Sequence, residues 1–326
     1  MKKMGAFSVI FSGFLLAFGS AVQARDFRAA DNQPADYPTG LAMQYMGEQI
    51  SKATNGKYNI KVFSNSVLGS GKDTTEQVKI GALEMTRVST SEFHGTIPET
   101  VIPSFPFLFR DGEHFHKAMY GAAGQQMLES FEKHGYIGLC IYEGGTRSIY
   151  GQKPFRSVAD TKGMKIRVQP SDLWVAVIGA MGATATPIPF AEVYTALKTG
   201  LVDAAENNYA SYESMKHFEA APYYSETEHV MAPDVVVFSK KIWETLSKEE
   251  QDIIRQAAKD SVPYFNKLWD QYVSKAKEAV AKAGSKIVPA KDIDKQSFVD
   301  AVRPVWDKFA TTPEQKTLLQ KIVDAK

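Results

Sequence analysis

The 326-residue sequence predicts an α/β protein of two domains. Segments with strand periodicity alternate with segments of helical periodicity along the chain, which is typical of mainly parallel sheets covered by helices. The alternation pauses at Gly144-Gly145 and then restarts, which marks a first crossover between domains. About 300 residues remain once the N-terminal segment is set aside, and that length suits two domains of ordinary size.

Residues 1–24 have the pattern of a secretory signal peptide. Two lysines stand at the start, an apolar run covers residues 6–22, and small residues precede Arg25. A membrane anchor is the alternative, but glycines and serines dilute the apolar run. We expect cleavage after Ala24, export to the periplasm and no direct membrane insertion of the mature chain.

The charge balance excludes several classes of partner. Without the two lysines of the signal peptide, 36 of the 38 basic residues remain against 37 acidic residues. That balance argues against nucleic acid and against a polybasic membrane patch. A preference for an anionic ligand must therefore come from a few well-placed arginines. The single cysteine, Cys140, lies in an apolar run and cannot form an internal disulfide.

The first half of the mature chain begins with an apolar strand that runs into a polar loop. Apolar residues at helical spacing and the Asn55-Gly56 stop then define a helix, and YNIKVF alternates as a strand. The predicted strands cover residues 27–31, 58–63, 84–88 and 136–142, and the predicted helices cover residues 39–52, 72–81 and 113–134.

The second half repeats the alternation and ends in a long helix. Predicted strands cover residues 164–168, 184–188, 201–204 and 235–238, and predicted helices cover residues 171–180 and 190–199. Ser247 to Glu250 form a capping box at the start of a helix that reaches Gly284, and Pro263 is expected to kink or split it. About 30 helical residues span ~45 Å, so this helix is expected to lie across both domains.

Motifs for catalysis are not found in the sequence. There is no G-x-S-x-G elbow, no Walker loop and no G-x-G-x-x-G after a strand. His114 and His116 are two residues apart at a helix start and point to different sides, so they do not suit a zinc site. We expect a protein that is not an enzyme and needs no cofactor or metal.

Arg167 is a candidate for anion capture. It lies near the carboxyl end of the predicted strand 164–168, where ligands bind in open α/β sheets. A guanidinium offers a planar fork that grips a carboxylate with two hydrogen bonds. A structural pair with Asp172 or another acid is an equally weighted alternative. Arg147, just after the glycine pair, is a weaker candidate of the same kind.

Two adjacent asparagines, Asn207 and Asn208, follow a short apolar strand. An amide both donates and accepts hydrogen bonds, so the pair could bind ligand hydroxyls. Asparagine also caps helices well, so capping of the next helix is the alternative.

These segments carry a family resemblance. GMKIRVQPSDLW (163–174) and PIPFAEVYTALKTGLVDAAENN (187–208) resemble the substrate-binding subunit of tripartite ATP-independent periplasmic (TRAP) transporters, the DctP family. Residues 62–85 and 103–111 match the same pattern, so the resemblance covers essentially the whole mature chain. It implies a two-lobed periplasmic binding protein fold with hinge strands and a long helix across both lobes. The implied division assigns residues 25–144 and 233–272 to lobe I and residues 145–232 and 273–326 to lobe II.

The resemblance also implies a binding site. Arg167 falls where the family binds the ligand carboxylate, Arg147 at a second arginine, Asn207 at an asparagine and Phe190 at an aromatic residue. Relatives often carry histidine where this chain has Asn32. The remaining positions implied as hydroxyl-binding or pocket-lining are Asn208, Asn32, Asp73, Arg87, Ser89 and Gln169.

Within the family, the sequence most resembles members that bind hexuronates, on segments such as ADNQPADYPT (30–39) and AAENNYASY (204–212). The expected ligand is a small organic acid of the glucuronate or galacturonate class, delivered by lobe closure to the TRAP membrane subunits. A C4-dicarboxylate or another monocarboxylate is the alternative ligand. From other classes, an exported α/β hydrolase and a structural protein of the envelope remain as alternatives.

Overall fold

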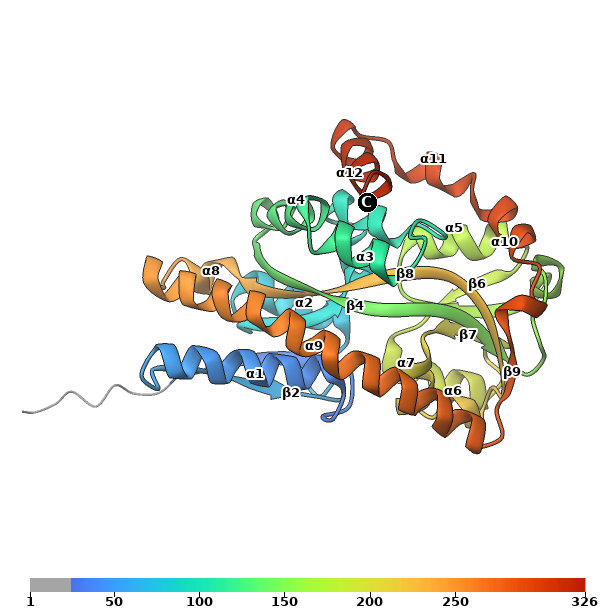
Figure 1. The fold of residues 1–326 in the computed structure, drawn as a ribbon, viewed down its shortest axis with the longest axis horizontal. Coiled ribbons are helices and arrows are strands. Elements are labelled where there is room, and N and C mark those ends of the chain that lie inside the picture. The colour runs from blue at the N-terminus through green and yellow to red at the C-terminus, as the bar shows by residue number, and fades with distance from the viewer. Residues whose placement is uncertain (1–24, 326) are drawn as a thin grey trace, which may run out of the picture.

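A computed structural model describes residues 25–325, so the predicted signal peptide lies outside the described part of the chain. The fold is built around one nine-stranded sheet with helices on its faces (Figure 1). The strands are β1 (Arg25–Asp31), β2 (Tyr58–Phe63), β3 (Met85–Ser89), β4 (Tyr136–Gly151), β5 (Lys165–Val168), β6 (Thr184–Pro187), β7 (Ala204–Asn207), β8 (Tyr223–Ser239) and β9 (Lys286–Val288).

The helices follow the predicted alternation. The α-helices are α1 (Pro38–Ala53), α2 (Gly71–Ile80), α3 (Gly112–Met119), α4 (Ala122–Ser130), α5 (Asp172–Ala180), α6 (Val193–Lys198), α7 (Tyr209–Ser214), α8 (Lys240–Trp243), α9 (Lys248–Lys282), α10 (Lys295–Val302), α11 (Val305–Phe309) and α12 (Pro313–Val323). The short 3-10 helices used below are η1 (Thr90–Phe93), η2 (Pro98–Ser104) and η5 (Phe190–Glu192). None of the described helices is long and apolar enough to cross a membrane.

The strand order β2-β1-β3-β8-β4-β7-β5-β6 divides the sheet into two lobes joined at the centre. The first lobe holds the parallel strands β2, β1 and β3, and the second holds the parallel strands β7, β5 and β6. Between them β4 and β8 pair antiparallel along most of their length and run through both lobes. These are the hinge strands that were expected. Each parallel half therefore directs the carboxyl ends of its strands toward the middle of the molecule.

The expected end of a strand at residue 142 is wrong, because β4 continues through the glycine pair to Gly151. The pairing with β8 shifts between Glu143 and Thr146, which is a β-bulge at the glycines. Gly145 has φ +71°, and a Cβ there would lie 2.6 Å from Cζ2 of Trp269. The bulge thus needs glycine for its backbone conformation and for the close approach of α9.

The 35-residue helix α9 links the two lobes. The predicted capping box is confirmed, since Ser247 Oγ accepts from the backbone N–H of Glu250 and the Glu250 side chain accepts from that of Ser247. The first two thirds of α9 bury Phe265 and Trp269 in a core shared with α1, whereas its last turns bury Val280 in a core shared with α7. In Figure 1 α9 crosses the molecule from α8 to β9.

Four further local predictions differ from the structure. The strand predicted over 235–238 is only the last part of β8. The helix predicted over 113–134 is interrupted after α3, because Gly121 starts a new helix where a Cβ would lie 2.5 Å from the carbonyl oxygen of Lys117. The strand predicted over 201–204 is shifted to β7, Ala204–Asn207. Pro263, which is exposed, does not split α9.

The division of the chain into lobes at residues 144 and 233 stays a prediction. Its last segment, 273–326, was expected to return to the second lobe. The final helix α12 instead contacts η2, α3 and α4, all of which precede residue 144. Leu318 and Ile322 of α12 are fully buried there. We therefore propose that α12 is placed with the first lobe.

Gly145→Ala is expected to destabilise the protein by about 2–4 kcal/mol, since alanine is strained at positive φ and its Cβ meets Trp269. Chemical denaturation monitored by tryptophan fluorescence measures the change. Gly95→Ala is the matched control, because a Cβ at Gly95 meets nothing within 4 Å. Equal stability of the two variants would contradict the tight approach of α9 to the bulge.

Candidate functional site

The loops that follow the parallel strands meet between the lobes. Ser91, just after β3, donates its hydroxyl to Oε1 of Gln169 at 2.8 Å and accepts from Nε1 of Trp174 at 3.0 Å. His94 Nδ1 and Ser171 Oγ lie 2.7 Å apart. The carboxyl ends of β3 and β5 therefore lie side by side, and hydrogen bonds join the two lobes along this edge.

Arg167 lies at this junction with its side chain fully buried. The flanking Ile166 and Val168 are core residues, so β5 is held in place and fixes the direction of the arginine. Nε and Nη2 of Arg167 both donate to the carbonyl oxygen of Ile188, at 2.9 and 2.7 Å. Within residues 25–325 its Nη1 has no hydrogen-bond partner.

The alternative in which Arg167 pairs with Asp172 is wrong for this structure, since no carboxylate of the described chain forms an ion pair with Arg167. Burial lowers the pKa of Arg167 to about 10, although the charge of Glu206 opposes that change. Burying an ion without a partner costs several kcal/mol. Arg167 is thus a cation at a place where an anion would be strongly stabilised.

Arg147, on β4, is neutralised by the protein itself. Its Nε and Nη2 donate to the two carboxylate oxygens of Glu206 at 2.6 and 2.8 Å, and Nη2 also donates to the backbone carbonyl of Glu206. Burial by itself raises the pKa of Glu206, but the charge of Arg147 and the hydrogen bonds lower it to about 2. The charge of Arg147 is therefore balanced by Glu206 within the protein.

The two asparagines after β7 have different surroundings. Asn207 accepts at Oδ1 from Nη1 of Arg147 at 2.8 Å, and its Nδ2 has no partner within the described residues. Asn208 accepts from the backbone N–H of Ser211 at 2.7 Å, which caps α7, and donates to the carbonyl of Gly144 at 2.6 Å. Asn208 therefore caps α7, which was the alternative to ligand binding. Nδ2 of Asn207 remains an unused donor within the described residues.

Arg87 forms a second buried charge cluster at the ends of β1 and β3. It is bound by Asp31 on one side and by Oδ2 of Asp234 at 3.1 Å on the other. Its Nη2 also donates to Oδ1 of Asn32 at 2.8 Å. Burial lowers the pKa of Arg87, but the two carboxylates outweigh burial and raise it. Arg87 and Asn32 thus belong to a hydrogen-bonded cluster that joins β1, β3 and β8.

The remaining predicted residues differ in their burial and in their distance from the lobe junction. Ser89 caps η1, and the Phe190 ring lies edge-on to His217, with ring centres 6.0 Å apart. Asp73 is exposed and closes a capping box with Ser70, and these hydrogen bonds lower its pKa. A structural role is therefore visible for Asp73, and nothing brings it into contact with Arg167.

Sequence reasoning missed Ser91, Trp174 and Glu206. Glu206 had a detectable signal, because an acid inside the short apolar strand of AAEN has to be buried and a buried acid requires a cation. Ser91 and Trp174 had none, since these two residues are 83 positions apart in the chain and meet only because the two lobes pack together.

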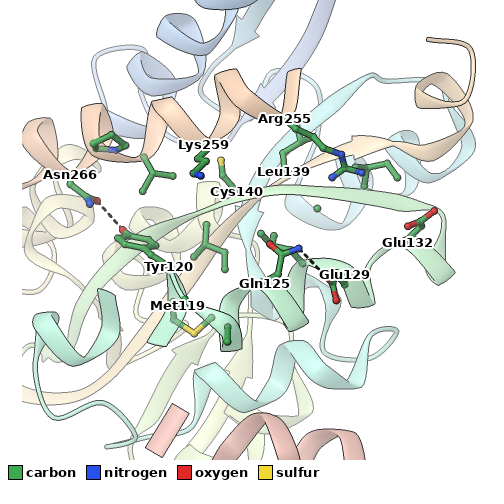
Figure 2. A pocket seen from close by; sticks show the side chains of 18 residues that line it. Met119, Tyr120, Gln125, Glu129, Glu132, Leu139, Cys140, Arg255, Lys259 and Asn266 are labelled. Atoms are coloured by element: carbon green, nitrogen blue, oxygen red, sulfur yellow. Dashed lines mark hydrogen bonds between the residues drawn. The ribbon is translucent and has the colours of Figure 1, made fainter. Parts of the chain in front are cut away.

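A cavity of about 720 Å³ lies away from these residues. It is lined by α4, by Ile137 to Ile141 of β4 and by α9, with Arg255 and Lys259 on one wall. Figure 2 shows these two side chains on α9, with Tyr120 hydrogen-bonded to Asn266 beside them. None of the predicted site residues lines this cavity. Across residues 25–325, no group of three or more potential ligand side chains could hold a metal ion.

The family model for bacterial extracellular solute-binding proteins, family 7 (DctP), matches residues 29–312. A solute-binding protein of Chromohalobacter salexigens is 35% identical over 96% of this chain and 94% of its own length. The 2,3-diketo-L-gulonate-binding periplasmic protein YiaO of Escherichia coli is 31% identical over 99% of both chains. A C4-dicarboxylate-binding periplasmic protein of Vibrio cholerae is 29% identical over 84% of this chain and 82% of its own length.

Solved structures extend the likeness. A TRAP periplasmic solute-binding protein from a Bradyrhizobium species, in complex with D-galacturonate, is 53% identical with a TM-score of 0.90 and covers 92% of this chain and all of its own. One from Xanthobacter autotrophicus, with bound β-D-galacturonate, is 46% identical with the same TM-score and coverage. One from Pseudomonas putida, with bound D-glucuronate, is 36% identical with a TM-score of 0.89, over 93% of this chain and 98% of its own.

The two arginines should respond differently to the same substitution in the ligand-free protein. Arg147→Met leaves the Glu206 carboxylate buried and unpaired, so it should lower the free energy of unfolding by about 3–5 kcal/mol. Arg167→Met removes an unpaired buried cation, and this gain offsets the two lost hydrogen bonds, so a change of about 1 kcal/mol or less is expected. Denaturant unfolding of both variants measures the difference, and equal losses would contradict it.

Proposed function

This chain belongs to family 7 of the bacterial extracellular solute-binding proteins (DctP), and from that premise we propose that it captures a hexuronate between its lobes, with the ligand carboxylate bound to Arg167. It is a periplasmic solute-binding protein of a TRAP transporter, a binding protein and not an enzyme, and it works with the membrane subunits of that transporter.

The observation that carries the proposal is the unpaired charge of Arg167. The side chain is fully buried at the lobe junction, and Nη1 has no partner within the described chain. A ligand carboxylate placed there would gain a charge-assisted hydrogen bond and remove the cost of an isolated buried ion. Nδ2 of Asn207 is a further donor at the same junction.

The charge balance favours a single carboxylate over two. Arg147 and Arg87 are neutralised by Glu206 and by Asp31 with Asp234, which leaves Arg167 as the cation with unused capacity among these three. A C4-dicarboxylate, which the Vibrio cholerae relative is named for, would bring a second negative charge that these arginines do not balance. A uronate has one carboxylate and a ring of hydroxyls, which suits one free arginine and a set of neutral polar groups.

Galacturonate and glucuronate are the two ligands to test first. The structures that are 53% and 46% identical to this chain hold galacturonate, and a more distant one holds glucuronate. A site whose buried polar groups hydrogen-bond ligand hydroxyls disfavours ligands without hydroxyls, because the polar groups of the protein are then left unpaired. Hydrogen bonds between the lobes, such as that from Ser91 to Gln169, are already formed in this structure and would hold the lobes together around the sugar.

Arg167→Lys should weaken galacturonate binding by roughly 10- to 100-fold, because an ammonium cannot reproduce the guanidinium fork. Isothermal titration calorimetry with galacturonate, glucuronate, succinate and malate measures this. Arg255→Lys, on the wall of the separate cavity, is the matched control and should bind like the wild type. Unchanged affinity in Arg167→Lys would remove Arg167 from its proposed role, and preference for succinate would overturn the uronate proposal.

Saturating ligand should raise the melting temperature. Ligand at 100 times its dissociation constant stabilises the folded state by about 2.7 kcal/mol. A thermal-shift panel should therefore show a rise of several degrees with a uronate and none with a neutral hexose that lacks the carboxylate. A similar rise with the neutral sugar would show that the carboxylate is not the anchor.

A further inference from the structure

Glu92 is an acid at the lobe junction that forms no ion pair with any cation of residues 25–325. It lies in η1, directly after β3, and is half-buried. Asp31, Glu206 and Asp234 at the same junction are each bound by an arginine. Within the described residues, the Glu92 carboxylate has neither an ion pair nor a hydrogen bond. Partial burial without a partner disfavours the charged form of a carboxylate.

Gly71 makes the room that this side chain occupies. A Cβ added to Gly71 would lie 2.7 Å from both Cδ and Oε1 of Glu92. The carboxylate therefore packs against the first residue of α2, on the first lobe. Any larger residue at position 71 would push it out of this place.

The charges around Glu92 come from two elements. Lys72 and Asp73 lie on α2, and Arg167 lies on β5 of the opposite lobe. Burial raises the pKa of Glu92 to about 7, although Arg167 and Lys72 oppose that change. Ser91, the neighbour of Glu92, donates to Gln169, two residues after Arg167, so Glu92 and Arg167 lie near each other at the junction without forming an ion pair. An unpaired cation and an unpaired anion thus lie on opposite lobes at one junction.

We propose that Glu92 binds hydroxyls of the sugar acid at the end remote from its carboxylate, and that its negative charge excludes ligands with a second carboxylate there. This inference rests on the proposed function and adds a specificity-determining residue to it. A carboxylate only accepts hydrogen bonds, and its two oxygens can accept from two neighbouring hydroxyls. Facing a second carboxylate in a poorly solvated site, it repels that group, which is discrimination by an unfavourable contact.

Glu92→Gln tests the inference, because it keeps the shape and removes the charge. Galacturonate affinity should fall by roughly 10- to 100-fold, since hydrogen bonds to a charged acceptor become neutral ones. Affinity for galactarate, the open-chain diacid in which C1 of galacturonate is also a carboxylate, should rise by about tenfold as the repulsion disappears. Glu132→Gln, on the distant cavity, is the control and should change neither affinity.

The pH dependence of galactarate binding gives a second measurement. With a pKa of about 7, Glu92 is mostly neutral at pH 6 and mostly charged at pH 8, so wild-type affinity for galactarate should fall about tenfold across this range. The pKa of Asp73 is lowered and that of Arg167 is about 10, so neither group titrates in this range. Glu92→Gln should bind galactarate with no such dependence.

Gly71→Ala is a second variant that leaves Glu92 in the sequence. Its methyl group displaces the flexible carboxylate, and alanine is a good helix former at this position, so the protein should fold and still lose galacturonate affinity. If wild-type protein binds neither uronate, the proposed function fails. If the wild type binds and Arg167→Lys does not, while Glu92→Gln matches the wild type for both ligands at both pH values, the inference about Glu92 is overturned.

Discussion

The balance of buried charge at the lobe junction is the constraint on which the rest of the structure depends. Two arginines are each neutralised by acids from other strands, Arg147 by Glu206 of β7 and Arg87 by Asp31 of β1 with Asp234 of β8. Such pairs add little net stability compared with apolar packing, but breaking one is expensive. They therefore fix which strands lie side by side at the centre of the sheet. The third arginine, Arg167, is held by the same framework and left without an acid of its own.

Much of this framework could be predicted from local sequence. The alternation in YNIKVF gave β2 with its observed limits, and the capping box at Ser247 located the start of α9. The position of Arg167 near the end of a strand followed from the apolar residues on either side of it. These features depend on residues close together in the chain, which is where periodicity and capping rules apply.

Long-range pairing could not be predicted. β4 continues past Tyr142 because β8, more than 80 residues further on, supplies hydrogen bonds to the glycine-containing bulge. The partner that neutralises Arg147 is 59 residues away, and the different environments of Asn207 and Asn208 depend on that same contact. Residue types alone did not distinguish a neutralised arginine from an unpaired one. Glu92 was missed for the same reason, since only the folded chain places it against Gly71.

The continuity of α9 couples the unfolding of one lobe to that of the other. Its first two thirds complete the core of one lobe and its last turns complete a core of the other. Neither lobe can therefore lose its packing without exposing apolar side chains of a helix that the other lobe also needs. Unfolding is expected to be one cooperative transition for the whole molecule, although the sheet has two halves. Unfolding of either lobe then exposes both lobes to proteases, so a chain damaged in one lobe is degraded as a whole.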